Sequence, residues 1–232
     1  DTILTGDLSF LDAIQNAGTL SVKMDGAPAI VWGTNPATGK FFVGTKSVFN
    51  KVRIKINESH EDIDKNHKGE VAIILHRCLS ALPRTEKIYQ GDFIGFGGSD
   101  EYTPNTVTYK FPEIVDEVII VAPHTVYNTE TTLRDAVAKP LRESLSNTQC
   151  VRFVMPTCAG LWELPPAMTT IMTLLPTVQF VSDKEAAQIR INVNRTLRES
   201  NALRVEDFNG NVTLMHLYGL VQYIKEELHH QC

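Results

Sequence analysis

The sequence predicts an α+β protein, in which an antiparallel β-sheet is flanked by helices and followed by a mostly helical C-terminal part. Between residues 20 and 123, short runs rich in β-branched and aromatic residues alternate with Gly, Pro and Asn, as strands and turns do. Before and after that region, apolar residues recur at helical spacing. A chain of 232 residues, 43% of them hydrophobic, can bury the core of one large domain.

The expected helices follow from apolar stripes and their end signals. Asp7 precedes a stripe that runs to Gly18, and Pro83 ends the stripe that begins at Val71. Three further helices are expected at residues 131–145, 183–199 and 212–229. The polar residues 50–67 are expected to form an exposed connection, and the proline-rich residues 156–176 a loop with some helix.

The expected strands are short runs bounded by turn residues. They comprise residues 20–24, 29–33, 40–46, 87–96, 105–111, 117–123 and 151–155. The turn-forming stretch TNPATG joins the second and third of these runs into an antiparallel hairpin, and Lys23 lies on the strand that enters it. We expect residues 1–130 to form a core that holds the functional site, and residues 131–232 to be a mostly helical continuation of the same domain.

Composition limits the classes of partner and compartment. The formal net charge of -5 gives no global basic field, so any groove for nucleic acid must be local. No apolar run approaches the ~20 residues that cross a bilayer, and residues 1–20 do not resemble a signal peptide. The four sparse cysteines fit reduced thiols in the cytoplasm better than disulfides or zinc. The absence of a starting Met and the ending HHQC suggest a truncated chain.

The segment Lys23-Met24-Asp25-Gly26 is the strongest chemical signal. Covalent nucleotidyl transfer needs an amine held against the α-phosphate of a nucleotide. A lysine before a glycine turn meets this demand, because Gly26 carries no Cβ and Pro28 stiffens the exit from the turn. We therefore expect a nucleotide to attach at Lys23.

Lys-x-Asp-Gly is the first motif of ATP-dependent DNA ligases, RNA ligases and RNA capping enzymes, and the chain resembles this nucleotidyltransferase superfamily. Residues 1–130 are also similar to an uncharacterised group of ligase-like phage proteins, through the stretches KMDGAPAIVWG, FFVGTKSVFNK, QGDF, TPNTVTY and HTVYN. The resemblance implies the ATP-grasp-like adenylation fold of ligases, with ATP and Mg²⁺ as cofactors. It also implies a lysyl-AMP at Lys23, AMP transfer to a 5′-phosphorylated RNA or DNA end, and the host cytoplasm as location.

The same resemblance implies the other residues of the site. Asp25 and Gly26 belong to the first motif, and Lys46 and Ser47 stand where a basic second motif follows the hairpin. Asp92, in the run YQGDF, stands in place of the glutamate of a third motif that binds ribose. The purine is expected to stack on Tyr109, Tyr127 or Phe93, none of which the chemistry favours, and His124 has the same ambiguity. Each of these positions also has a structural reading, as a solvated lysine, a turn aspartate or a core aromatic.

Two motifs of the superfamily are missing, and their absence leaves other functions open. The chain has no Glu-Gly dipeptide, and no Lys-x-Lys follows Lys55. The alternatives are a catalytically incomplete nucleotide- or partner-binding module and a viral structural or assembly protein that reuses the fold. Lys51, Arg53 and Lys55 line either a phosphate track or an exposed strand face. Glu206 and Asp207 cap a helix or bind magnesium, the former being favoured.

Overall fold

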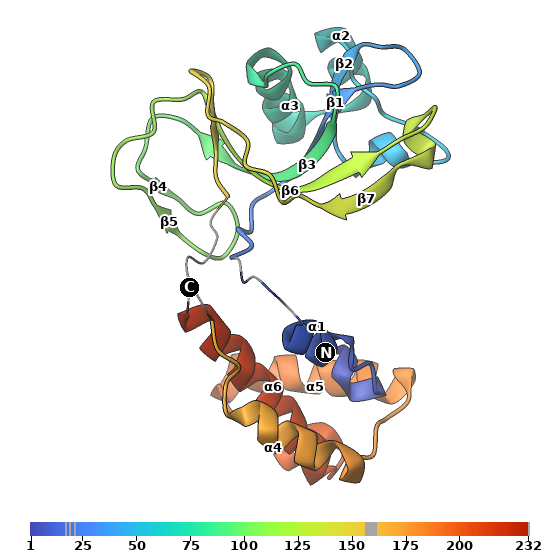
Figure 1. Cartoon of the computed structure of the whole chain (residues 1–232), viewed down its shortest axis with the longest axis vertical. Coiled ribbons are helices and arrows are strands. Elements are labelled where there is room, and N and C mark those ends of the chain that lie inside the picture. Colours follow the sequence, from blue (N-terminus) through green and yellow to red (C-terminus); the bar gives the residue numbers. More distant parts are fainter. Residues whose placement is uncertain (17, 19, 21, 156–161, 232) are drawn as a thin grey trace. The chain divides into compact units, whose positions relative to one another are not determined.

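The chain forms two compact units in the computed structural model, which describes all residues except 17, 19, 21, 156–161 and 232. Residues 23–156 form a sheet unit, and residues 1–22 and 157–232 form a helical unit (Figure 1). The expected α+β class, with an antiparallel sheet and helices, is confirmed. The units do not follow the expected division at residue 130, because two later strands complete the sheet and the first helix shares a core with the last ones.

A six-stranded sheet is the centre of the sheet unit. Its strands are β1 (Ala29–Thr34), β2 (Phe41–Gly44), β3 (Ile88–Phe96), β6 (Ile119–Asn128), β7 (Val137–Pro140) and β8 (Val151–Phe153). The order is β2-β1-β3-β6-β7 with antiparallel neighbours, and β8 adds to β6 in parallel. The expected hairpin is confirmed, since Val31 pairs with Gly44 and Thr34 with Phe41.

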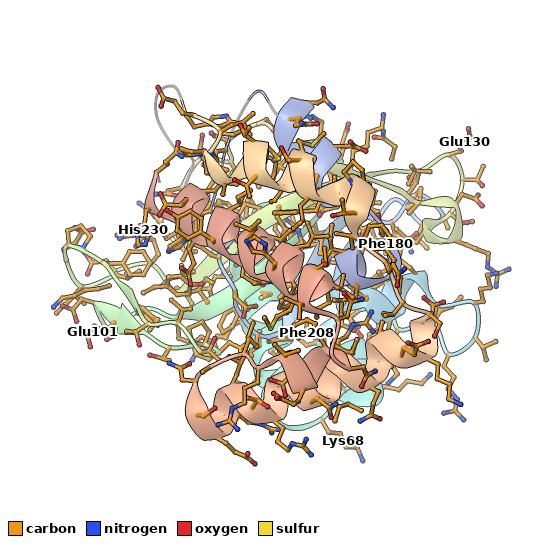
Figure 2. The ribbon with its side chains drawn as sticks, turned by 90° about the horizontal axis from the view of Figure 1, so that it is seen from below. Lys68, Glu101, Glu130, Phe180, Phe208 and His230 are labelled. Carbon is orange, nitrogen blue, oxygen red and sulfur yellow. The ribbon has the colours of Figure 1, made fainter. Side chains whose placement is uncertain are left out.

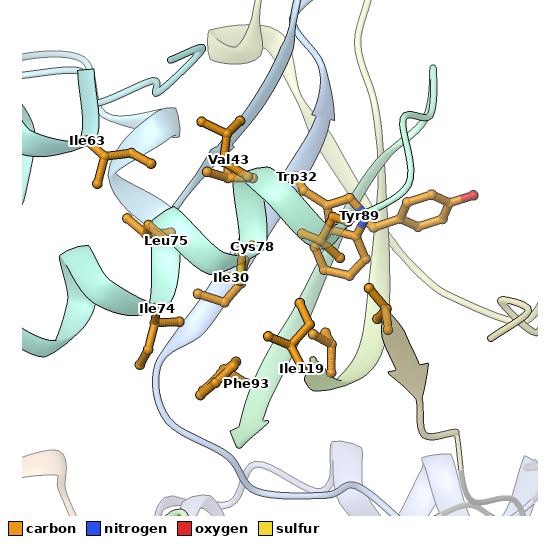
Figure 3. Close-up of a cluster of buried hydrophobic side chains, with 14 of the residues drawn as sticks. Ile30, Trp32, Val43, Ile63, Ile74, Leu75, Cys78, Tyr89, Phe93 and Ile119 are labelled. Carbon is orange, nitrogen blue, oxygen red and sulfur yellow. The ribbon is translucent and has the colours of Figure 1, made fainter. Parts of the chain in front are cut away.

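Two helices, α2 (His60–Asn66) and α3 (Gly69–Ala81), cover one face of this sheet (Figure 1). Figure 3 shows their core, in which Trp32, Ile63 and Leu75 are fully buried. The α3 helix was expected, whereas α2 was hidden in the polar residues 50–67. The Ser59 side chain caps α2 by accepting the Asp62 N–H, and Ile63 supplies its single buried anchor.

The opposite face of the sheet carries two smaller apolar clusters. One lies under the short helices η2 (Lys46–Phe49) and η3 (Leu133–Asp135) and contains Val31 and Leu133. The other contains Met24 and Ile94 and packs against β4 (Glu101–Tyr102) and β5 (Tyr109–Lys110). These two strands form a separate antiparallel pair, so the expected strand at 105–111 is present only in its last part.

The expected helix at residues 131–145 is wrong. Pro140 cannot continue a helix, because it has no N–H and its ring clashes with the preceding turn. Strand β6 extends beyond β8 and leaves an open edge, and β7 pairs there through Ala138 with Tyr127. The apolar residues that imitated a helical stripe serve different surfaces: Leu133 is buried, whereas Val137 is 59% exposed.

The expected strand at residues 20–24 is also wrong, so Lys23 does not lie on a strand. Leu20 packs in the core of the helical unit, and Met24 packs in the sheet unit. A segment that passes from one core to another has no partner strand along its length. Lys23 instead lies in an irregular segment before β1, and residue 21 of this stretch lies outside the described part of the chain.

The helical unit has one apolar core, which includes Phe208 (labelled in Figure 2). Its elements are η1 (Thr2–Thr5), α1 (Ser9–Asn16), α4 (Ala167–Leu174), η4 (Leu175–Thr177), α5 (Asp183–Ser200), η5 (Val205–Phe208) and α6 (Val212–His230). The expected first helix and the two closing helices are confirmed. Among the described residues, no helix is both long and apolar enough to cross a membrane.

Candidate functional site

Three hydrogen bonds between described residues hold the segment from Lys23 to Gly26 in place. The Gly26 N–H donates to Asp92 Oδ2 at 3.0 Å, and the Asp25 N–H donates to the Tyr109 hydroxyl at 2.6 Å. The Asn105 amide donates to Asp25 Oδ2 at 2.9 Å. Met24 is buried, whereas Lys23 is exposed. The segment is therefore anchored at every residue after the lysine, and the lysine side chain stays accessible.

Gly26 is required by a close backbone approach and not by a left-handed conformation. A Cβ at this position would lie 2.4 Å from the Phe93 carbonyl oxygen and 2.9 Å from the Asp92 Cβ. The Ala27 N–H donates to the same Phe93 oxygen at 3.0 Å, and the Phe93 N–H donates to the Pro28 oxygen at 3.0 Å. The motif glycine thus lets the lysine segment lie directly against β3.

Asp92 is the carboxylate nearest to this segment. It belongs to the face of β3 opposite the α2 and α3 helices, since Tyr89 and Phe93 face those helices and side chains alternate along a strand. Asp92 is 8% exposed, and its Oδ1 lies 3.2 Å from His124 Nε2. Burial acts to raise its pKa, but the bonds from His124 and Gly26 and the charges of His124 and Lys23 lower the pKa below its usual value. Asp92 is therefore a carboxylate at neutral pH.

Gln90 and Tyr127 continue the same face of the sheet. The Tyr127 hydroxyl donates to Gln90 Oε1, and Gln90 is only 4% exposed. The Tyr127 ring lies 4.4 Å from the Phe49 ring, and burial raises the pKa of its phenol. Tyr127 therefore places an aromatic ring on this face of the sheet, at the position on β6 that pairs with Ile88.

Tyr109 lies elsewhere. Its hydroxyl accepts the Asp25 N–H, and its ring packs with Met24 and Ile94 beside the β4–β5 pair. The structure gives Tyr109 a part in holding the lysine segment, which the sequence pattern did not indicate. Asn105, which bonds to the Asp25 carboxylate, was missed for the same reason: both lie about 80 residues away along the chain.

Lys46 and Ser47 follow β2 in η2. Because β2 ends at Gly44 opposite Val31, they lie at the end of the hairpin where β1 begins. Lys46 is exposed and forms no ion pair with any described residue. The Ser47 hydroxyl lies 2.8 Å from Thr45 Oγ1. The Thr45 side chain also caps η2 by accepting the Ser47 N–H.

His124 is the residue of the site that sequence reasoning left ambiguous. Its signal was Pro123 inside an apolar run, because a proline within a sheet marks an edge or a bulge. Gly91 pairs with Pro123 and Gln90 with Thr125, so His124 is the extra residue of a bulge beside Asp92.

Metal ligands are sparse in the described part of the chain. No group of three His, Cys, Asp or Glu side chains there can hold a metal ion. Asp207 is engaged structurally: its carboxylate accepts the Arg204 N–H at 2.9 Å and the Thr196 hydroxyl at 2.8 Å. This geometry favours the capping alternative for Asp207.

Comparison with known proteins places the chain in a family. The model of a family of unknown function, DUF6267, matches residues 3–213, and the chain therefore belongs to this family. No curated protein and no solved structure matches the chain.

Proposed function

We propose that this DUF6267 protein is an ATP-dependent adenylyltransferase of the ligase type that forms a covalent lysyl-AMP at Lys23. One observation carries the proposal: an exposed lysine precedes a hairpin, and the glycine three residues after it donates its N–H to a buried carboxylate. The hydrogen bonds of Asp25 and Gly26 fix the backbone next to Lys23 before a nucleotide arrives. The sheet unit is accordingly proposed as an adenylation core of the nucleotidyltransferase type.

The proposed chemistry is a displacement at phosphorus. The neutral Lys23 amine attacks the α-phosphate of ATP, an N–P bond forms, the bond to the β-phosphate oxygen breaks, and pyrophosphate leaves while the amine proton passes to solvent. Asp92 is suited to accept hydrogen bonds from the ribose hydroxyls, Lys46 to bind phosphate, and Tyr127 to contact the base. Mg²⁺ enters as the ion that ATP carries on its phosphates, because the described residues supply no three-ligand group.

The proposed acceptor is a 5′-phosphorylated nucleic-acid end in the cytoplasm. Lys51, Arg53 and Lys55 follow Lys46 on the loop after η2, and the Lys55 N–H donates to the Ser47 oxygen at 3.3 Å. None of these cations forms an ion pair in the part of the chain that the structure describes. In a chain of net charge -5, this local group is a suitable place for a phosphate backbone.

The test is incubation with ATP labelled at the α-phosphate, followed by denaturation. We expect acid-labile label on the wild-type protein, none on Lys23→Ala, and none on Lys23→Arg, which keeps the charge beside Asp92 but does not deprotonate. Lys40→Ala is the matched control, because Lys40 is an exposed lysine at the other end of the hairpin. Label that is absent from the wild type, or unchanged in Lys23→Ala, would contradict the proposal. GTP in parallel tests the base preference.

A second candidate is a nucleotide- or partner-binding module without catalysis. The missing Glu-Gly and Lys-x-Lys motifs favour it. The helical unit also exposes large apolar side chains that a partner, or an assembly of viral proteins, would cover; examples are Met172, Ile191, Leu197, Val212 and Tyr223. Calorimetric binding of ATP without covalent label would distinguish this candidate from the enzyme.

A further inference from the structure

The two side-chain contacts of His124 define which ring nitrogen carries the hydrogen when the imidazole is neutral. Its Nε2 lies 3.2 Å from Asp92 Oδ1, and its Nδ1 lies 2.7 Å from Thr125 Oγ1. A carboxylate only accepts, so Nε2 carries the hydrogen, and in the neutral ring Nδ1 accepts from the Thr125 hydroxyl. With this assignment, a neutral imidazole makes both hydrogen bonds of the series Thr125–His124–Asp92.

The backbone holds this arrangement. The bulge at His124 is fixed by Pro123, which has no N–H for the ladder, and by the Leu141 N–H, which donates to the His124 carbonyl oxygen at 3.0 Å. The side chains of His124 and Asp92 are 28% and 12% exposed. The imidazole is thus fixed from both sides and remains reachable by protons from solvent.

Asp92 connects His124 to the lysine segment. One carboxylate oxygen takes the imidazole and the other takes the Gly26 N–H, so rotation of Asp92 would break both contacts. The charged groups that bear on this carboxylate are His124 and Lys23. Lys139 on β7 pairs with Val126, whose side chain packs against the core on the α2 and α3 side. Because paired residues of antiparallel strands point to the same face, Lys139 belongs to the face of the sheet opposite Asp92.

We propose that His124 is a positioning residue of the Lys23 site, which fixes the Asp92 carboxylate against Gly26 and makes the charge beside Lys23 depend on pH. The inference rests on the proposed function only for its readout at Lys23. With a neutral imidazole, Lys23 is the remaining charged group that acts on the Asp92 carboxylate. A protonated imidazole shares that carboxylate and weakens its hold on the lysine ammonium.

The first test follows the His124 ring by NMR as pH is varied, in the full chain and without nucleotide. Removing the carboxylate in Asp92→Asn is expected to shift the titration midpoint of His124 to lower pH. Removing the nearby cation in Lys23→Ala is expected to shift it to higher pH. Lys40→Ala serves as the matched control and is expected to leave it unchanged. A His124 midpoint that is the same in Asp92→Asn and the wild type would overturn the inference.

The second test measures the rate of lysyl-nucleotide formation across pH. His124→Leu removes the donor to Asp92 and is expected to slow label formation by roughly 10- to 100-fold, the order seen when a reacting group is misplaced. His124→Gln restores a donor to Asp92 and is expected to recover most of the rate, but without the imidazole's pH dependence. A wild-type rate and pH profile in His124→Leu would also overturn the inference. A wild type that takes no label contradicts the proposed function instead, and the NMR titration then decides this inference by itself.

Discussion

Gly26 and Gly219 illustrate opposite uses of glycine. At Gly26 a Cβ would meet the Phe93 oxygen at 2.4 Å, whereas a Cβ at Gly219, within α6, meets nothing within 4 Å. We expect Gly26→Ala to lower the free energy of unfolding by about 1–3 kcal/mol, as overpacking does. Gly219→Ala is the control and is expected to raise it by up to about 1 kcal/mol. Urea denaturation measures both, and a neutral Gly26→Ala would contradict the close approach.

Asp92 stabilises the fold in a pH-dependent manner. Burial opposes its charge, but the His124 and Gly26 bonds and the nearby cations hold its pKa below the ordinary 3.8. For a carboxyl group with a lowered pKa in the folded state, the stabilisation is present above the ordinary pKa and is lost as pH falls through the lowered one. Asp92→Asn is therefore expected to cost about 1–3 kcal/mol at pH 7. Denaturation at pH 3 should show a smaller difference, and an undiminished one would argue against a charged Asp92.

The sequence indicates some residues of this site and hides others for physical reasons. Lys23 and Gly26 belong to a local motif whose spacing is readable. Asp92 follows a glycine on a strand, and its pattern is visible once the first motif is found. His124 and Asn105 act through contacts made by a bulge and by a loop 80 residues distant, which no local spacing encodes.

The α2 helix is attached at its C-terminal end by a neutral histidine. Asn57 Nδ2 lies 3.2 Å from His67 Nε2, while Asn57 Oδ1 accepts the Asn66 amide. Because Asn57 presents only hydrogens to the ring, His67 must accept. Burial first, and then the charge of Lys55, lowers the pKa of His67 from its ordinary 6.5. The stabilisation is therefore present above about pH 6.5 and is lost as pH falls below it.

Hydrogen exchange of the α2 amides tests this attachment. Exchange corrected for its intrinsic pH dependence is expected to show less protection at pH 5 than at pH 7.5. His67→Gln keeps an acceptor that does not titrate, and it should flatten this dependence while α5, in the helical unit, stays unaffected. Equal protection of α2 at both pH values in the wild type would show that His67 does not hold it.

At the scale of elements, apolar periodicity predicts a helix correctly where the apolar residues pack against one surface. It fails where they pack against two. The α3, α5 and α6 helices each bury one stripe, and they were read correctly. In residues 131–145 the apolar spacing of a helix is divided between two faces of the sheet, and the open edge of β6 turns part of it into β7. Such an edge exists only in the folded sheet, so no local pattern announces it.

The division into two units is visible in how the cores are built. Among the described residues, every buried cluster of the sheet unit draws on residues 23–156, and the cluster of the helical unit draws only on the two flanking segments. Units with separate cores are able to fold alone. We therefore expect a fragment of residues 23–156 to give a native-like NMR spectrum and to keep the lysine-dependent labelling proposed for the full chain.

A fragment of residues 23–130 is the matched control, since it ends where the sequence pattern alone would place the boundary. It lacks β7 and β8, and with β8 it loses Val151, which is fully buried, and Phe153, whose ring lies 6.1 Å from the Trp32 ring. Removing a Phe side chain from such a core costs by itself about 3–5 kcal/mol, which is comparable to the whole stability of a small domain. We expect this shorter fragment to lose cooperative thermal unfolding. A shorter fragment that unfolds as cooperatively as residues 23–156 would show that the sheet is complete without its last strands.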